Sequence, residues 1–426
     1  MTRNAAIHYH PEGYTTSADR LMGRHAAGEG FINGFFRHAQ VDRFYAYCES
    51  KESFLQFQQS ATADATPRES VWIPHTAPER LVEAGALYVP GPDLAGPAWV
   101  RRMIHPTGWS LTGVTHTICS DRIMDALGAL MTAPLESWDA IICTSSVVKS
   151  SLERVFTRYG DYLAARLGVR PQASRLQLPI IPLGVNCASF APSPATEKAR
   201  AGWRARLGIG ADDVVSLFMG RLSYHAKAHP LPMYLGLEAA ARATGKKTWL
   251  IQAGWFANDA IEKEFVEGAR QYCPTVNALF LDGRKPDIRQ QVWFAADIFI
   301  SLSDNIQETF GITPIEAMAA GLPVVVSDWN GYRDTVRQGE VGFRIPTVMP
   351  AAGFGMELAK GFHLGQDTYD RYIGNASQCV AVDVVATGQA LTRLVADPAL
   401  RRAMGTAGRA LARERYDWGV IIPQYQ

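Results

Sequence analysis

The sequence contains no long apolar run, and this absence argues against a membrane-spanning helix. None of its apolar stretches reaches the roughly 18 residues expected of a helix that crosses a bilayer. The N-terminal residues also lack the apolar core of a secretory signal peptide. We therefore expect a cytoplasmic protein, and we keep peripheral contact with the inner face of the membrane as an alternative.

Cysteine is scarce and scattered. The six cysteines include no Cys-x-x-Cys pair, which argues against both a disulfide framework and a zinc site. The histidine pairs His8/His10 and His225/His229 lack the carboxylate of a His-Glu-x-x-His motif. No metal site and no cofactor are predicted.

An excess of charge of one sign is also lacking. The chain has 42 Lys and Arg against 41 Asp and Glu, so its formal net charge is +1. This balance gives no indication of a nucleic-acid partner. A loose basic run surrounds one predicted amphipathic helix, and we expect it to be a solvated face. A docking surface for an anionic or lipid-linked acceptor is the alternative. The run consists of Lys149, Arg154, Arg158, Arg166, Arg170 and Arg175.

Two common nucleotide-binding motifs are missing. Residues 28–34 are one position off the Gly-x-Gly-x-x-Gly spacing, so a dehydrogenase fingerprint is absent. Gly245-Lys-Lys lacks the upstream glycine and the downstream Ser or Thr of a Walker loop. Internal repeats of 20–50 residues and low-complexity tracts are absent as well.

What is present is the composition of a soluble globular protein with more than one domain. The chain is 47% hydrophobic and 19% charged, and its length suggests two domains. The segment that follows Ile181-Pro-Leu-Gly is rich in turn residues and bracketed by prolines, so we place the boundary there. The predicted domains are residues 1–190 and 191–400.

Strands and helices alternate regularly from about residue 214 onward. This rhythm predicts a parallel, doubly wound α/β sheet that binds ligands at the carboxyl ends of its strands. Because Gly220 and Glu308 each follow such an end, they should share one edge of the sheet. The strands are expected at 214–220, 247–253, 278–281, 297–302 and 323–327, with helices at 231–244 and 259–272.

The first half is less regular but has the same character. Its expected strands are 5–9, 70–73, 110–117 and 140–144, and its expected helices are 26–39 and 147–167. These elements favour a second domain of the same class.

The segment 308–328, ETFGITPIEAMAAGLPVVVSD, carries the strongest functional signal. Glu308 and Glu316 stand eight positions apart across a loop-to-helix junction. A helix N-terminus offers free N–H groups to phosphate, while carboxylates accept hydrogen bonds from hydroxyls, and a sugar-nucleotide requires both. The alternative is a capping box in which Thr313 is the N-cap, Pro314 the first helical residue and Glu316 the N3 partner.

Two cations follow the first strand of the second domain. Arg221 and Lys227 stand six positions apart just after Gly220. The planar fork of arginine and the point charge of lysine together suit the two phosphates of a pyrophosphate. The alternative is a solvated polar loop.

These motifs resemble those of the retaining sugar-nucleotide glycosyltransferases of family 4. The resemblance extends from about residue 181 to 418 and matches the first half only in outline. It implies the GT-B fold, in which two facing Rossmann-like domains enclose a cleft, with residues 1–190 on the acceptor side and 191–400 binding the donor. It also implies that residues 401–426 form a helical segment returning toward the N-terminal domain. The matching motifs are Ile181-Pro-Leu-Gly-Val-Asn, Gly220-Arg-Leu with Lys227, the pair Glu308 and Glu316, and Glu414-Arg-Tyr-Asp-Trp418.

The resemblance assigns roles to the residues of the second domain. It implies that Glu308 binds hydroxyls of the donor sugar and that Glu316 holds the ribose hydroxyls. Arg221 and Lys227 would neutralise the diphosphate leaving group. Beside Gly220, the phosphate would be cradled by the backbone amides of Phe310, Gly311 and Ile312. One departure is Ala228, where the family usually has glycine after the lysine.

In the first domain, His116 in Gly113-Val-Thr-His-Thr resembles the family's cleft histidine, which contacts the donor sugar. The alternative is a half-buried structural histidine. The family's first loop usually carries paired glycines, but this chain has Met22-Gly23-Arg24-His25 instead. Gly23 and Arg24 are the candidates there for substrate contact.

The expected function is metal-independent, retaining transfer of a hexosyl group from a nucleotide-diphospho-sugar to a saccharide or other hydroxyl acceptor. Such a reaction belongs to polysaccharide or glycoconjugate synthesis. The alternatives are a sugar-nucleotide epimerase or phosphorylase of the same fold, and a non-catalytic binding or assembly subunit. The sequence does not specify the base, the sugar, the acceptor or the oligomeric state.

Overall fold

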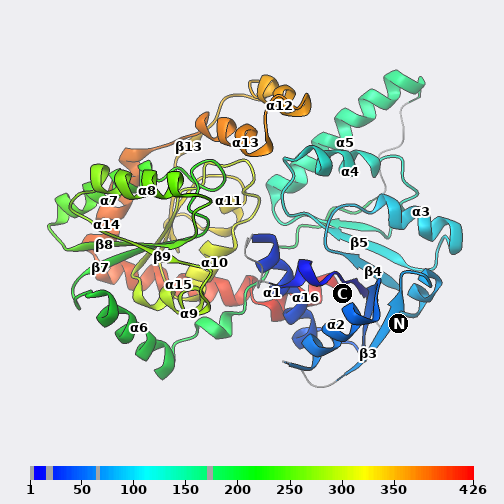
Figure 1. Ribbon diagram of the computed structural model, residues 1–426, viewed down its shortest axis with the longest axis horizontal. Helices are drawn as coiled ribbons and strands as arrows, with labels where there is room; N and C mark the ends of the chain where they lie inside the picture. Colours follow the sequence, from blue (N-terminus) through cyan, green and yellow to red (C-terminus); the bar gives the residue numbers. More distant parts are fainter. Residues whose placement is uncertain (1–3, 16–22, 64–67, 170–175) are drawn as a thin grey trace. The chain divides into compact units, whose positions relative to one another are not determined.

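The computed structural model describes residues 4–15, 23–63, 68–169 and 176–426. It divides into two compact units, Met1–Asn186 with Tyr416–Gln426, and Cys187–Arg415 (Figure 1). The chain enters the second unit at Cys187, close to the boundary placed at 190. The segment predicted as 401–426 is split between the units, because only its last eleven residues, 416–426, belong to the first.

The first unit is built on a six-stranded sheet with the order β3-β2-β1-β4-β5-β6, and neighbouring strands are parallel. This arrangement is the doubly wound sheet predicted from the sequence. Strands β2 and β4 had not been predicted. The strands are β1 (Ala6–His8), β2 (Arg43–Cys48), β3 (Glu69–Pro74), β4 (Ala86–Val89), β5 (Ser110–Val114) and β6 (Ala140–Ile142).

Helices cover both faces of this sheet through two separate apolar cores. In one core, α16 packs against α1 because Gly30 and Gly34 leave room for the ring of Trp418. A Cβ added at Gly34 would lie 2.7 Å from Trp418 Cγ. The helices are α1 (Gly23–His38), α2 (Lys51–Ala63), α3 (Ala95–Ile104), α4 (Asp121–Ala129), α5 (Ser146–Leu167) and α16 (Trp418–Tyr425), with 3-10 turns at Pro11–Tyr14 and Pro78–Glu83.

A buried ion pair ties α3 to the loop before β6. Arg101 donates to Asp139 in a bidentate arrangement, with N–O distances of 2.6 and 2.7 Å. The Asp139 carboxylate also accepts from the backbone N–H groups of Leu111 and Glu136, at 2.8 Å each. Both charged side chains are almost fully buried, so each depends on the other for compensation.

Asp139→Ala is therefore expected to destabilise the first unit by about 3–5 kcal/mol, because it leaves the Arg101 charge buried and unpaired. Urea unfolding followed by circular dichroism measures this free energy. The matched control is Glu69→Ala, which breaks the exposed pair with Arg43 and should cost about 1 kcal/mol or less. Equal losses in the two variants would contradict the assignment.

The second unit contains another six-stranded parallel sheet, with the order β12-β11-β10-β7-β8-β9. Its first five strands along the chain were predicted, whereas β12 was not. They are β7 (Val214–Met219), β8 (Thr248–Gly254), β9 (Asn277–Asp282), β10 (Ile298–Ser301), β11 (Val324–Ser327) and β12 (Gly342–Ile345). A small antiparallel pair is formed by β13 (Thr347–Val348) and β14 (Ala381–Val382).

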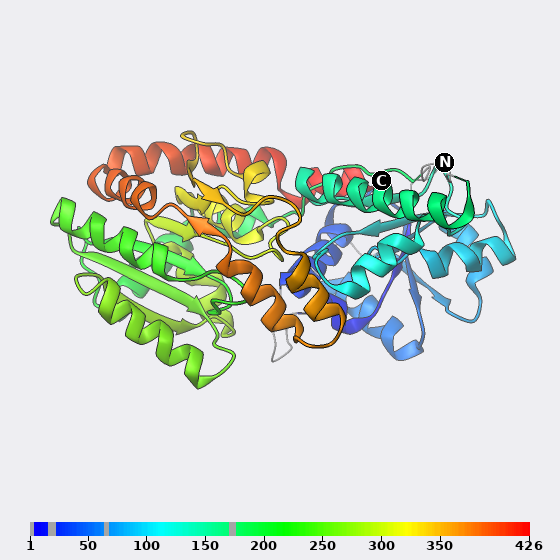
Figure 2. The same cartoon turned by 90° about the horizontal axis from the view of Figure 1, so that it is seen from above.

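Figure 1 shows β7, β8 and β9 between α7 and α8 on one side and α9 and α15 on the other, and Figure 2 gives the view from above, from the side of α7 and α8. Helices α7 and α8 begin and end at the predicted residues, and α7 packs along α14. The helices are α6 (Pro194–Leu207), α7 (Leu231–Thr244), α8 (Asp259–Tyr272), α9 (Pro286–Gln291), α10 (Ile312–Ala319), α11 (Tyr332–Thr335), α12 (Met356–His363), α13 (Tyr369–Gln378), α14 (Val384–Ala396) and α15 (Pro398–Arg415).

Strands β7 and β10 are neighbours in this sheet. The loops that follow them, β7–α7 and β10–α10, therefore leave from the same edge, at the carboxyl ends of the strands. This edge holds the residues singled out in the sequence.

Candidate functional site

Helix α10 begins earlier than the capping box requires. Its first residue is Ile312, and its N-cap is Gly311 with φ 88°, a left-handed conformation, and no side-chain cap. The Thr313–Glu316 capping box is therefore wrong. Among the described residues the buried Thr313 Oγ1 has no hydrogen-bond partner. The first-turn N–H groups of Ile312 and Thr313 have no partner within the helix and can bind an anion.

Two features require glycine at position 311: the left-handed backbone conformation and the close approach of Tyr332. A Cβ added there would lie 2.1 Å from Tyr332 Cε1, and the positive φ adds conformational strain.

Gly311→Ala is expected to cost about 3 kcal/mol or more of unfolding free energy, from strain and overpacking together. Chemical denaturation measures this loss. The control is Gly339→Ala, which has φ 76° and no atom within 4 Å of the added Cβ. This control should lose only about 1 kcal/mol. A neutral Gly311→Ala would show that the loop can relax away from Tyr332.

The central contact of the site joins the two loops. Lys227 Nζ donates to Glu308 Oε2 at 2.5 Å, and the two side chains are only 18% and 11% exposed. Burial lowers the pKa of Lys227. The electrostatic effects of Glu308 and Tyr332 and the hydrogen bond to Glu308 together raise it by more, so the pKa lies above its ordinary value. The ammonium is therefore charged at neutral pH. Tyr332 Oη lies 3.3 Å from Glu308 Oε2 and 2.9 Å from Ser301 Oγ.

Arg221 adds a second cation to the β7–α7 loop. It follows Gly220, which has φ 151°, and its Nη2 donates to the carbonyl of Ala226 at 3.1 Å. Burial lowers the pKa of Arg221, while the charges of Asp370, Tyr369 and Glu308 oppose that shift. The loop closes with alanine at position 228, where the Ala228 N–H donates to the Ser223 carbonyl at 3.2 Å.

The β10–α10 loop is fixed to the β7–α7 loop by residues that the sequence reasoning missed. Ser303 Oγ donates to the carbonyl of Lys227 at 3.0 Å, and Asn305 Nδ2 donates to the carbonyl of His225 at 2.7 Å. Asp304 Oδ2 accepts from the N–H of His229 at 3.1 Å. The available signal was the polar run Ser303-Asp-Asn directly after an apolar strand.

Glu316 lies in the second turn of α10 and is partly buried. Burial raises its pKa to about 7, against an opposing effect of the Arg289 charge. Burial also raises the pKa of Asp304, in the β10–α10 loop, to about 7. Both carboxyl groups therefore change their charge close to neutral pH.

The structure brings Arg221, Lys227 and Glu308 together at one edge of the second unit, with the start of α10 in the same loop. Phe310 precedes the helix start, and its side chain is buried.

The remaining predicted residues belong to the first unit. His116 follows β5 and is partly buried, and Gly23 is the exposed first residue of α1. The side chain of Arg24, and residues Arg170 and Arg175 of the basic run, lie outside the described part of the chain.

Across the described ranges, no group of three or more His, Cys, Asp or Glu is arranged to hold a metal ion. His8 and His10 instead contact each other, with their Nε2 atoms 2.9 Å apart. In the same part of the chain, no helix combines the length and hydropathy needed to cross a membrane.

Part of the second unit matches a known protein family. The family model for glycosyl transferases group 1 matches residues 199–360. A D-inositol 3-phosphate glycosyltransferase from Nocardia farcinica is 27% identical over 41% of this chain and 37% of its own length. The putative glycosyltransferase EpsD from Bacillus subtilis is 26% identical over 54% and 57% of the two chains. The chain thus spans about a third to three-fifths of the length of the curated relatives it matches first.

The fold has solved counterparts. The Anabaena protein Alr3699/HepE, crystallised with UDP, aligns with a TM-score of 0.58 at 18% identity over 96% of both chains. Its complex with UDP-glucose aligns with a TM-score of 0.56 at 17% identity, over 99% of this chain and 98% of that one.

The two parallel sheets with flanking helices thus define the GT-B fold. Residues 199–360 match the group 1 glycosyl transferase model, and this match supports the similarity of the chain to glycosyltransferases of the family 4 type. The resemblance stated from the motifs is confirmed.

Proposed function

We propose that this protein transfers a hexosyl group from a nucleotide-diphospho-sugar to a hydroxyl acceptor, with retention and without a metal ion. The donor would bind at the carboxyl edge of the second sheet and the acceptor at the first unit. The observation that carries this proposal is the convergence of Arg221, Lys227 and Glu308 beside the start of α10.

The two cations suit a departing diphosphate. Negative charge develops on the β-phosphate as the glycosidic bond breaks, and fixed donors aimed at that charge lower the barrier by about 3–4 kcal/mol each. Lys227 is held charged and nearly buried, where its electrostatic effect is stronger than in water. The N–H groups of Ile312 and Thr313 would bind the remaining phosphate oxygens.

The two glutamates suit the polyol parts of the donor. Glu308, whose Oε2 already accepts from Lys227, would accept hydrogen bonds from sugar hydroxyls through its other oxygen. Glu316 would hold the ribose hydroxyls. His116 would contact the donor sugar, and Gly23 and Arg24 would lie near the bound substrates.

Retention is proposed from the family resemblance. The implied route is attack on the face from which the diphosphate leaves, with the departing phosphate oxygen taking the acceptor proton. The proposal of metal independence rests on Arg221 and Lys227, because two fixed cations can neutralise a diphosphate as a divalent ion does. Full activity in the presence of EDTA would support this second part, and loss of activity that added Mg²⁺ restores would contradict it.

A non-catalytic binding subunit is the main rival, and the presence of all four charged residues of the motif argues against it. A thermal-shift panel of UDP-, GDP- and ADP-sugars, followed by an assay for release of the nucleoside diphosphate, separates the two. A ligand at 100 times its Kd stabilises the native state by about 2.7 kcal/mol. Thermal stabilisation by a nucleotide-sugar together with release of its nucleoside diphosphate supports the transferase. Stabilisation with no release of the nucleoside diphosphate, whether water or any tested acceptor is present, supports the rival.

Donor affinity is expected to rise with pH through neutrality. The pKa of Glu316 is raised to about 7 in the folded protein, so the stability gained from its protonation is present at low pH and lost as the pH rises from about 4.5 to about 7. Ribose hydroxyls need the ionised carboxylate. The ionised fraction grows from about a tenth at pH 6 to about nine-tenths at pH 8, which predicts an approximately tenfold gain in affinity.

Calorimetric titration of a nucleotide-sugar at pH 6, 7 and 8 measures this effect. Glu316→Gln should give weaker binding that no longer varies with pH. Asp304→Asn is the control, because the pKa of Asp304 is also raised to about 7, and this variant should keep the dependence. If the pH dependence disappears in Asp304→Asn and persists in Glu316→Gln, the assignment of the effect to Glu316 is wrong.

A further inference from the structure

A cavity lies at the edge of the second unit's sheet opposite Arg221, Lys227 and Glu308. Four of its lining residues come directly before strands: Asp213 before β7, Lys247 before β8, Asp297 before β10 and Pro323 before β11. The cavity is therefore at the amino-terminal edge, whereas the candidate donor site is at the carboxyl edge. Its volume of about 900 Å³ is within the range of small-molecule sites.

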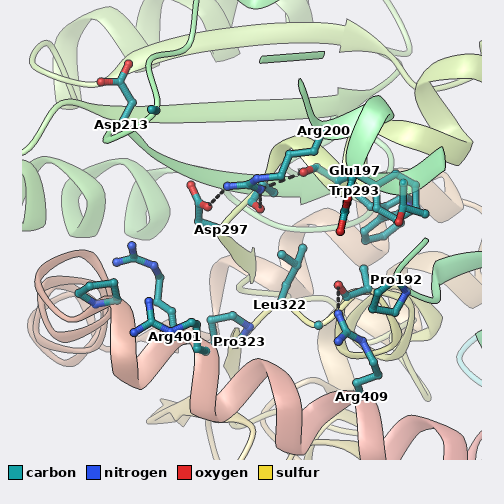
Figure 3. Close-up of a pocket in the computed structure, with 18 of the residues that line it drawn as sticks. Pro192, Glu197, Arg200, Asp213, Trp293, Asp297, Leu322, Pro323, Arg401 and Arg409 are labelled. Atoms are coloured by element: carbon teal, nitrogen blue, oxygen red, sulfur yellow. Dashed lines mark hydrogen bonds and ion pairs between the residues drawn. The ribbon is translucent and has the colours of Figure 1, made fainter. Parts of the chain in front are cut away.

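Cations outnumber acids around this cavity. Six basic side chains face four acidic ones, which leaves two positive charges in excess. The basic residues are Arg200, Lys246, Lys247, Arg401, Arg402 and Arg409, and the acidic ones are Glu197, Asp212, Asp213 and Asp297. Figure 3 shows Arg401 and Arg409 extending from α15 toward the cavity, across from Arg200 and Asp297.

The two less exposed acids are already neutralised. Asp297 pairs with Arg200 at 2.7 Å and with Arg204 at 3.2 Å. Asp213 pairs with Lys247 at 3.3 Å and accepts from Trp249 Nε1 at 2.8 Å. The other two acids are exposed to solvent.

Four of the cations, by contrast, have no ion pair within the described ranges: Lys246, Arg401, Arg402 and Arg409. Arg401 Nη1 donates to the carbonyls of Leu394 and Val395 at the end of α14. Arg409 donates to the carbonyls of Ala319 and Ala320 at the end of α10. These bonds fix the two guanidinium groups in place without an ion pair, although the charges of Asp297 and Asp397 act on Arg401 from a greater distance. Burial lowers the pKa of both groups. A bound anion would offset the free-energy cost of keeping these buried guanidinium groups charged.

We propose that this cavity is a second binding site, for a phosphorylated small molecule. A phosphate dianion matches the two excess positive charges, and the guanidinium forks of Arg401 and Arg402 provide planar, bidentate recognition of its oxygens. Arg401 directs only Nη1 to protein carbonyls, and the Nε and Nη2 donors are left for a ligand. Leu322, Pro323 and Trp293 supply apolar contact for the organic part. The site stands independently of the proposed sugar transfer.

Calorimetry with inorganic phosphate, a hexose phosphate and a nucleoside monophosphate tests the proposal, with the unphosphorylated hexose as a blank. The protein used is the full chain carrying Lys227→Gln, so that the candidate donor site does not contribute. We expect one saturable site for at least one phosphorylated probe. Arg402→Gln with Lys246→Gln should weaken it at least tenfold. If inorganic phosphate binds as tightly as the hexose phosphate, the ligand is free phosphate, and tighter binding of an organic phosphate identifies that class instead.

The matched control is Arg413→Gln with Lys263→Gln, which removes the same charge from exposed positions that do not line the cavity. It should change the affinity less than twofold. If both double variants lose affinity for the phosphorylated probe equally, the binding is non-specific charge attraction and the proposal is overturned. The absence of saturable binding by all three phosphorylated probes, in variants shown by circular dichroism to be folded, would overturn it as well.

Discussion

Glu308→Gln is expected to lower the rate of sugar transfer by about 10²–10³-fold, the effect of losing one preorganised electrostatic group. The amide keeps the shape of the side chain but removes the charge that faces Lys227 at 2.5 Å. Affinity for a nucleoside diphosphate should survive or increase, because Lys227 then has no competing carboxylate. Transfer and binding are therefore expected to separate in this variant.

The measurement needs no knowledge of the natural acceptor, because slow hydrolysis of the best nucleotide-sugar from the thermal-shift panel can be followed by chromatography. Glu340→Gln is the matched control, since Glu340 is exposed and, in the part of the chain that the structure describes, pairs only with the nearby Arg337. Thermal unfolding checks that the variant is folded, because an unpaired Lys227 costs stability. A Glu308→Gln protein that hydrolyses its donor at the parent rate would show that the site is wrongly assigned.

Lys227→Gln is expected to weaken nucleoside diphosphate binding at least 100-fold. The change removes one of the two fixed cations and also leaves the Glu308 carboxylate unpaired beside the phosphates, so that attraction is replaced by repulsion. Arg221 would then be the remaining one of the two cations that neutralises the negative charge of the diphosphate.

The double variant Lys227→Gln with Glu308→Gln isolates the repulsive part. It should bind more tightly than Lys227→Gln alone, because the unpaired carboxylate is gone. Calorimetric titration of the wild type, both single variants and the double variant completes the cycle. Identical affinities for Lys227→Gln and the double variant would mean that Glu308 does not face the bound diphosphate.

The fold of the second unit was predictable because its local signals agree with one another. Apolar strands such as β7 alternate with amphipathic helices such as α7 and α8, and the structure places both helices at the predicted residues. The missed strands are explained by their length or composition. β2 (RFYAYC) and β12 (GFRI) each contain an arginine instead of an unbroken apolar run, and β4 (ALYV) has only four residues. Their place in the sheets depends on pairing with distant segments.

The site was predictable where a short motif carries the chemistry. Arg221, Lys227 and Glu308 were found in this way, and the structure places them together. Ser303, Asn305 and Tyr332 were missed because their contacts join segments far apart in sequence. The capping box failed for a local reason. The sequence Thr313-Pro-Ile-Glu satisfies the motif, but the left-handed Gly311 is the N-cap and the helix begins two residues earlier, at Ile312.

Calorimetric titration of the wild-type protein and of Lys227→Gln with UDP, GDP and ADP tests most directly whether the carboxyl edge of the second sheet is a nucleoside diphosphate site. Lys263→Gln serves as the control, because Lys263 is an exposed residue of α8 that belongs neither to this site nor to the cavity at the opposite edge of the sheet. At least one nucleoside diphosphate should bind the wild type and Lys263→Gln with equal affinity, and Lys227→Gln should weaken that binding at least 100-fold. Failure of all three to bind the wild type, or equal affinity in Lys227→Gln, would contradict the assignment of the site.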